Sequence, residues 1–134
     1  MAKDSMDNIT LQLLSKDPHI VQVAFRGSWT WNEVDALVPH GSFPAESERP
    51  PLYIVADLTE SAALPPSALV RAYGILNRSP SNMRQTIIIT KNSFVEGLVT
   101  TFRKVFGKYQ QVVAVVSSQE EALQIINAEA SRDN

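Results

Sequence analysis

The order of strand-like and helix-like segments constrains the fold of this chain more than any other feature of its sequence. Two strand-like segments, at residues 9–15 and 20–27, are followed by a helix and then by three strand–helix pairs. Alternating strands and helices predict an α/β domain, and a leading pair of strands joined by a short turn predicts an antiparallel hairpin. The sequence therefore predicts an α/β fold with a single-layer mixed sheet of about five strands. The core of this sheet is parallel, its edge is an antiparallel hairpin, and about four helices accompany it in the order β-β-α-β-α-β-α-β-α.

The hydropathy patterns distinguish the edge of this sheet from its centre. Residues 9–15 and 20–27 alternate apolar and polar side chains, as strands with one polar face do. Strands that are buried on both faces read instead as continuous apolar runs, and three later runs have this character. They lie at residues 52–58, 86–90 and 112–116.

Capping residues and breakers delimit the four helices. Thr30 and Glu33 have capping-box spacing, as do Ser118 and Glu121, so they predict helices that begin there. Pro65-Pro66 opens a helix that runs to Asn77, with an inward stripe of Leu69, Tyr73 and Leu76. Ser93 is the predicted cap of a helix that ends at Phe106. Residues 39–51 hold four of the eight prolines and predict an irregular exposed loop.

Length and composition limit the classes of protein that this chain can represent. Its 134 residues predict one domain over 1–134, with frayed ends at 1–8 and 131–134. It has no cysteine, which excludes disulfides and thiolate catalysis. The net charge of −2, with both signs interspersed, argues against nucleic acid as a partner. The first residues lack a signal-peptide pattern, and no apolar run is long enough for membrane insertion, so we expect a cytoplasmic protein.

The element order resembles the STAS domain, the fold of bacterial anti-sigma-factor antagonists of the SpoIIAA type, and the wider SpoIIAA-like superfamily. That superfamily is structurally related to CRAL-TRIO lipid-binding domains. The local similarity is strongest at residues 54–59 (Ile-Val-Ala-Asp-Leu-Thr), which match the family's apolar strand ending in Asp-Leu-Ser. The junction at residues 27–31 (Gly-Ser-Trp-Thr-Trp) is also similar to that of some SpoIIAA-like proteins, and we expect one buried indole and one partly exposed.

The resemblance implies one regulatory serine. The antagonists carry an Asp-Ser-Ser-Gly turn whose serine is phosphorylated, and the corresponding residues here are Pro65, Pro66, Ser67 and Ala68. Only Ser67 matches, so the phosphorylation motif is not intact. Ser67 remains a candidate phospho-acceptor or partner contact, because a helix N-terminus stabilises added negative charge. An ordinary polar residue in a first turn is the alternative.

Polar residues follow the predicted parallel strands and form a second candidate site. Ligands of open α/β sheets favour the crevice beyond the carboxyl ends of such strands. The side chains expected there are Asp57, Thr59, Glu60, Lys91, Asn92 and Ser117. The competing interpretation is that every such fold has polar strand ends and helix caps.

Motifs for catalysis, cofactors and metals are missing from the sequence. It contains no glycine-rich phosphate loop, Walker lysine loop or nucleophile elbow. His19 and His40 fall in predicted loops, and neither has a partner at metal-ligand spacing. We therefore predict no enzyme, no catalytic residue, no cofactor and no metal. An enzyme that uses Asp57 and Lys91 is the least favoured alternative.

The predicted helix at 93–106 has an apolar stripe wider than one sheet face needs. A core helix explains most of it, but part of the stripe can form an interaction surface. The candidate residues for that surface are Tyr73, Phe94, Phe102 and Phe106.

Two functional hypotheses from different classes follow. The first is a non-catalytic regulatory module that resembles anti-sigma-factor antagonists and binds a protein partner, or itself as a homodimer. Its contact surface is expected on the helix around Ser67 to Tyr73, with the helix at 93–106 as a further candidate. The second is a carrier or sensor that binds a small apolar or lipid-like ligand between the sheet and its helices.

Overall fold

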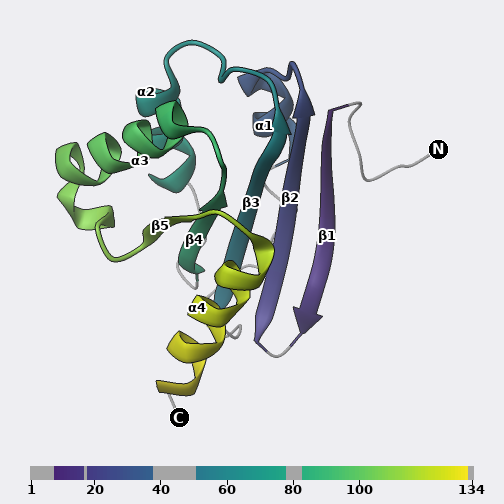
Figure 1. The fold of residues 1–134 in the computed structure, drawn as a ribbon, viewed down its shortest axis with the longest axis vertical. Helices are drawn as coiled ribbons and strands as arrows, with labels where there is room; N and C mark the ends of the chain where they lie inside the picture. Colours follow the sequence, from purple (N-terminus) through teal and green to yellow (C-terminus); the bar gives the residue numbers. More distant parts are fainter. Residues whose placement is uncertain (1–7, 17, 38–50, 78–82, 133–134) are drawn as a thin grey trace.

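The structure is a computed structural model that describes residues 8–16, 18–37, 51–77 and 83–132, and its elements follow the predicted order. The strands are β1 (Ile9–Lys16), β2 (His19–Gly27), β3 (Leu52–Ser61), β4 (Met83–Ile89) and β5 (Val113–Val116). The helices are α1 (Trp31–Leu37), α2 (Ala68–Asn77), α3 (Ser93–Val105) and α4 (Gln119–Arg132), with a short 3-10 helix η1 (Gly107–Tyr109) after α3. The predicted mixed α/β fold is confirmed (Figure 1).

The strands lie in the sheet in the same order as in the chain. The sheet order is β1-β2-β3-β4-β5; β1 pairs antiparallel with β2, and every later pair is parallel. Parallel crossovers are right-handed, so connections that always advance in one direction put their helices on one face. Helices α1, α2 and α3 accordingly share one face of the sheet, and α4 covers the other (Figure 1).

The face under α4 is closely packed. Its core consists of residues that are at most 3% exposed, from four elements: Ile20, Tyr53, Val55, Ile87, Ile89, Ala122 and Ile126. The opposite face has two smaller buried clusters. One joins α3, η1 and β5 through Val95, Val99, Phe102, Tyr109 and Val113. The other joins β1, β2 and α1 through Ile9, Phe25, Trp29 and Val34.

A bulge in β1 changes the predicted alternation of the hairpin. Leu13 pairs with Val21 but Ser15 pairs with Ile20, so Leu14 is the extra residue in β1. Leu14 therefore packs toward the α4 face, whereas Leu13 is 48% exposed. The alternation predicted for residues 9–15 puts Leu13 on the apolar side with Ile9 and Leu11, and the bulge makes this wrong for Leu13.

The boundaries around β3 and α2 also differ from the prediction. Strand β3 continues past Leu58 to Ser61, because a bulge opposite β2 puts two residues of β3 against Phe25. Helix α2 begins at Ala68, not at Pro65-Pro66. Strand β2 begins at His19, which was predicted to lie in a loop.

The predicted caps and ends need smaller corrections. Asn92, not Ser93, caps α3, because its Oδ1 accepts hydrogen bonds from the amides of Phe94 and Val95. Asn8 is hydrogen-bonded to Arg26 and Ser28 at the end of β2, and α4 extends to Arg132. Fraying of the ends at 1–8 and 131–134 stays a prediction. The rest of those termini, and the predicted loop at 39–51 up to residue 50, lie outside the described residues, as does His40.

Candidate functional site

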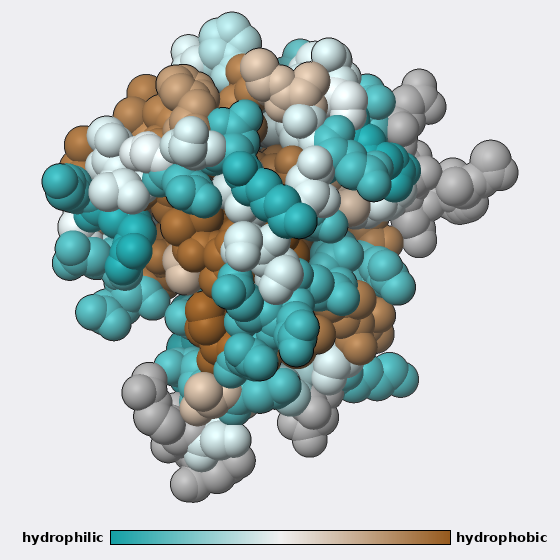
Figure 2. Space-filling model, in the orientation of Figure 1, coloured by the Kyte–Doolittle hydropathy of each residue, from teal (hydrophilic) through white to brown (hydrophobic). Residues whose placement is uncertain are grey.

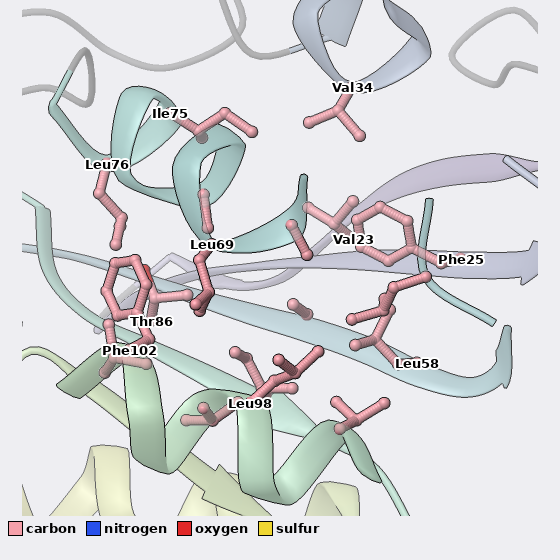
Figure 3. Close-up of a pocket in the computed structure, with 18 of the residues that line it drawn as sticks. Val23, Phe25, Val34, Leu58, Leu69, Ile75, Leu76, Thr86, Leu98 and Phe102 are labelled. Carbon is pink, nitrogen blue, oxygen red and sulfur yellow. The ribbon is translucent and has the colours of Figure 1, made fainter. Parts of the chain in front are cut away.

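The most prominent feature of the α1–α3 face is an apolar cavity of about 210 Å³, partly open to solvent. Its floor is the sheet, and its walls come from α1, α2 and α3. In Figure 3, Leu69, Ile75 and Leu76 of α2 point toward the cavity from one side, and Leu98 and Phe102 of α3 point toward it from the other. The cavity lies between the sheet and its helices, where the second functional hypothesis put a ligand.

Helix α2 creates this space because it stands away from the sheet. None of its residues is buried, although Leu69, Ile75 and Leu76 face inward. The inward positions also include Ala68 and Ala72, whose side chains are short. A helix at this position with no buried side chain is unusual for a core element, since apolar helices normally bury their inner stripe.

Two tryptophans close the cavity at the end near α1. The rings of Trp29 and Trp31 are packed edge to face, with their centroids 4.9 Å apart, and the centroid of the Phe25 ring lies 4.6 Å from that of Trp29. Both indole N–H groups are already bonded: Trp29 donates to Ser61 Oγ at 2.7 Å, and Trp31 donates to the carbonyl of Pro66 at 2.9 Å. These rings therefore offer the cavity carbon faces only. Trp29 is buried and Trp31 is half-buried, as predicted.

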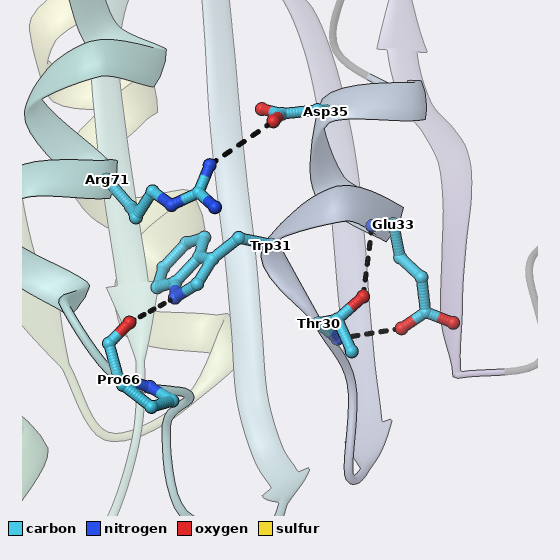
Figure 4. A network of polar contacts seen from close by, with 6 residues as sticks. All are labelled: Thr30, Trp31, Glu33, Asp35, Pro66 and Arg71. Atoms are coloured by element: carbon cyan, nitrogen blue, oxygen red, sulfur yellow. Dashed lines mark hydrogen bonds and ion pairs between the residues drawn. The ribbon is translucent and has the colours of Figure 1, made fainter.

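Polar contacts at the same end connect α1 to α2 (Figure 4). Trp31 and Pro66 form one of them, and Arg71 and Asp35 form an ion pair at 3.5 Å whose two side chains are partly exposed. Exposed ion pairs stabilise weakly, by about 0–1 kcal/mol. The predicted capping box of Thr30 and Glu33 is confirmed, with bonds of 2.8 and 3.2 Å that fix the start of α1. These contacts hold α2 over the cavity without burying it.

An aromatic cluster closes the other end, where α2 meets α3 and η1. Tyr73 stacks on Phe106 at 4.4 Å, and Phe102 contacts both Phe106 and Tyr109. Tyr109 also donates a hydrogen bond to Asn77 Oδ1 at 3.1 Å, which ties the end of α2 to η1.

One polar side chain other than the two tryptophans lines the cavity among the described residues. It is Thr86 of β4, whose hydroxyl donates to Met83 Sδ at 3.4 Å. No charged side chain belongs to the described lining. A buried water needs two to four polar partners, so a cavity with a single hydroxyl favours apolar contents over ordered water.

The four residues of the predicted interaction surface differ in their exposure to solvent. Phe102 is 4% exposed and forms part of the cavity wall, so it is not a surface residue. Tyr73 and Phe106 are half-buried against each other. Phe94 is 67% exposed and is the one residue of the four that lies on the outer surface.

The strand order lacks the reversal at which a crevice of the predicted polar kind normally forms. A crevice of that kind forms where the strand order reverses, and the order β2-β3-β4-β5 never does. Several of its residues have local structural roles instead. Asp57 accepts hydrogen bonds from the amide and hydroxyl of Thr59 at 3.0 and 2.7 Å, beside the β3 bulge, and Asn92 caps α3.

The remaining residues of that set lie at the surface or support α4. Glu60 and Lys91 are exposed. The amide and hydroxyl of Ser117 donate to Glu121 Oε1 at 2.8 and 3.0 Å, and these hydrogen bonds lower the pKa of Glu121 below its ordinary value of 4.5. The predicted capping box is confirmed in one half: the Ser118 hydroxyl accepts the amide of Glu121 at 3.1 Å. The Glu121 carboxylate, however, reaches back to Ser117 and not to Ser118. A polar ligand at these residues stays a prediction.

Ser67 is exposed and directly precedes α2. Its backbone is left-handed, with φ of 66°, and its carbonyl accepts the amide of Arg71 at 3.0 Å. The carbonyl bond is that of an N-cap residue, but N-cap residues are normally extended, so the left-handed backbone of Ser67 is a strained conformation for a serine. Phosphorylation of Ser67 stays a prediction.

Part of the cavity was visible in the sequence, and part was not. Leu69 and Leu76 were predicted to face inward, but Ala56, Ala72 and Thr86 were not singled out. The available signal was the pair Ala68 and Ala72, one turn apart on the inner side of a helix, opposite Ala56 on the central strand.

Comparison with known proteins identifies the fold and nothing finer. No protein-family model and no curated protein matches the sequence. The structure is similar to an uncharacterised protein of the DUF3478 family from Shewanella loihica PV-4, which has a SpoIIAA-like fold. The TM-score is 0.62 at 14% identity, over 92% of this chain and 98% of the other. The chain therefore has the SpoIIAA-like fold that its element order predicted.

The described helices include none that is both long and apolar enough to cross a membrane. Cytoplasmic location stays a prediction.

Proposed function

We propose that this protein is a non-catalytic carrier or sensor that binds a small apolar molecule between the sheet and helices α1 to α3. The observation that carries the proposal is the cavity of about 210 Å³ with a nearly all-carbon lining. An engineered protein cavity of about 150 Å³ with a comparable lining stays dry and binds benzene. The volume here is therefore sufficient for a substituted aromatic ring or a short branched chain.

The contacts that the cavity walls lack favour an occupant. Engineered enclosed voids destabilise proteins by about 24 cal/mol per Å³, so about 5 kcal/mol is the upper limit for a space of this size, and the cost is smaller here because the cavity is partly open to solvent. Domains of this size are stable by about 5–15 kcal/mol in total. A ligand that restores the missing contacts with the cavity walls offsets a large share of such a cost.

Ligand-dependent stabilisation tests this function. Toluene is added to the purified protein, and the shift in melting temperature and the NMR signals of the cavity methyl groups are followed. We expect saturable stabilisation and shifts at residues such as Leu69 and Val99, which line the cavity.

A blocking variant and a matched control make the test specific to the cavity. Ala72→Phe puts a ring into the cavity from α2, whereas Val70→Phe adds the same ring on the exposed side of that helix, since Val70 is 70% exposed. We expect Ala72→Phe to abolish the response to toluene and Val70→Phe to keep it. Equal responses from the two variants, or no response from the parent protein, would contradict the proposal.

A second candidate function is protein–protein contact through the outer side of α3, and a distinct observation supports it. Phe94 and Val105 are 67% and 61% exposed and are eleven residues apart, which puts them on one side of the helix. Figure 2 shows hydrophobic residues at the surface over α2 and α3, mixed with hydrophilic ones. The partner is another protein or a second copy of the chain.

Light scattering over a range of concentrations tests this candidate. If the surface mediates a homodimer, Phe94→Asp with Val105→Asp lowers the measured mass to that of a monomer. Thr100→Asp, an exposed change on the same helix, leaves it unchanged. A monomeric parent protein at all concentrations would remove the homodimer from consideration.

A further inference from the structure

The cavity contains one hydroxyl that the fold hardly uses. Thr86 lies on β4 beside Ile54 of β3, and its side chain is grouped with Leu76 and Phe102 at one end of the cavity (Figure 3). Its described side-chain bond is the one to Met83 Sδ, and a thioether is a weak acceptor.

The threonine at the other end of the same apolar run is different. Thr90 is 1% exposed, and its hydroxyl accepts the amide of Asn92 at 3.1 Å, so it supports the loop that leads into α3. The hydroxyl of Thr86 has no equivalent structural role, and valine has nearly the same shape and a high preference for strands. The hydroxyl therefore calls for another explanation.

We infer that Thr86 orients the ligand, and that the ligand is a neutral, largely apolar molecule with one hydrogen-bonding group, such as a phenol, alcohol or ketone. This inference rests on the proposed function and names the ligand class of the same cavity. A hydroxyl both donates and accepts, so it matches either type of group, and it can leave the weak sulfur acceptor at little cost.

The rest of the lining excludes other ligand classes. A charged group inside the cavity has no opposite charge among the described lining residues, and an unpaired buried charge is strongly disfavoured. Both indole N–H groups are bonded to the protein, so they do not compensate a second polar group. One hydrogen-bonding group thus matches what the cavity offers.

A pair of probes that differ by one hydroxyl tests the inference. The dissociation constants of toluene and p-cresol are measured by NMR titration for the parent protein, for Thr86→Val and for Thr86→Ser. One hydrogen bond corresponds to about a fivefold change in affinity. We expect Thr86→Val to weaken p-cresol about fivefold and to leave toluene within about twofold. Thr86→Ser, which keeps the hydroxyl, should retain the preference of the parent protein.

The outcomes separate this inference from the proposed function. If toluene binds and Thr86→Val changes both probes equally, the orienting role of Thr86 is wrong and the apolar site stands. If neither probe binds the parent protein, the proposed function is wrong and this inference falls with it.

Discussion

The two faces of the sheet are built from the same strands but are packed in different ways. Under α4, residues such as Val55, Ile87 and Ile126 are fully buried. On the opposite face none of the residues of α2 is buried, and a cavity of about 210 Å³ lies between this helix and the sheet. Protein interiors are normally packed like organic crystals. The contrast shows that the packing directly under α2 is looser than the packing under α4.

Truncation of one large side chain on each face should give the largest difference. Ile126→Ala removes a fully buried side chain from α4, and we expect a loss of about 3 kcal/mol in the free energy of unfolding. Leu69→Ala removes a side chain that borders the cavity, and we expect about 1 kcal/mol because fewer contacts are lost. Urea denaturation measures both, and equal losses would mean that α2 is packed as firmly as α4.

Enlargement of an alanine on each face sharpens the comparison. Ala122→Leu forces extra atoms into the packed α4 face, where Ala122 is 0% exposed, and should destabilise by about 2 kcal/mol. Ala72→Leu extends into the cavity and should be neutral or stabilise by about 1 kcal/mol. Denaturation of the two variants under identical conditions checks the difference in sign; destabilisation by both would show that the space beside Ala72 is already filled.

Loss of the hydrogen bond between α1 and the segment that leads into α2 should loosen the cavity face of the sheet without affecting the α4 face. Trp31→Phe keeps a ring in the wall but removes the donor to the Pro66 carbonyl, at a cost of about 1 kcal/mol. Hydrogen exchange should become faster in α2 and stay unchanged in α4. Faster exchange in both helices would mean that the two faces do not open independently.

The smallest expected effect is a pH dependence at the start of α4. Hydrogen bonds from Ser117 lower the pKa of Glu121 below 4.5 in the folded protein, so their stabilisation is present above that pH. It is lost as the pH falls through the folded pKa, because the carboxyl group then becomes protonated. Denaturation between pH 6 and about pH 3 should show a smaller decline for Glu121→Gln than for the parent protein. An identical decline would remove Glu121 from the account.

The sequence predicted the fold well because its signals are local. Alternation, apolar runs and the capping box at Thr30 and Glu33 each act over a few residues. Boundaries failed where a tertiary feature intervened: the β3 bulge extended the strand past Leu58, and α2 began only after Pro65-Pro66. The strand order is also a tertiary property, so the sequence alone did not show that the sheet has no switch point.

The location of the candidate site could be predicted from the sequence, but the residues that line it could not. A ligand between sheet and helices was one of two hypotheses, yet no lining residue was assigned to it. A cavity arises from the distance between α2 and the sheet, which hydropathy does not encode. The alanines at positions 56, 68 and 72 were a signal of space, but alanine is equally common in close-packed helices, as Ala122 shows.

Native mass spectrometry of the protein isolated from its own cells tests the central claim most directly. We expect a monomer or dimer that carries the additional mass of a small non-covalent ligand, and we expect this mass to be lost in Ala72→Phe but not in Val70→Phe. A parent protein that carries no additional mass and is indistinguishable from Ala72→Phe in this respect would contradict the account.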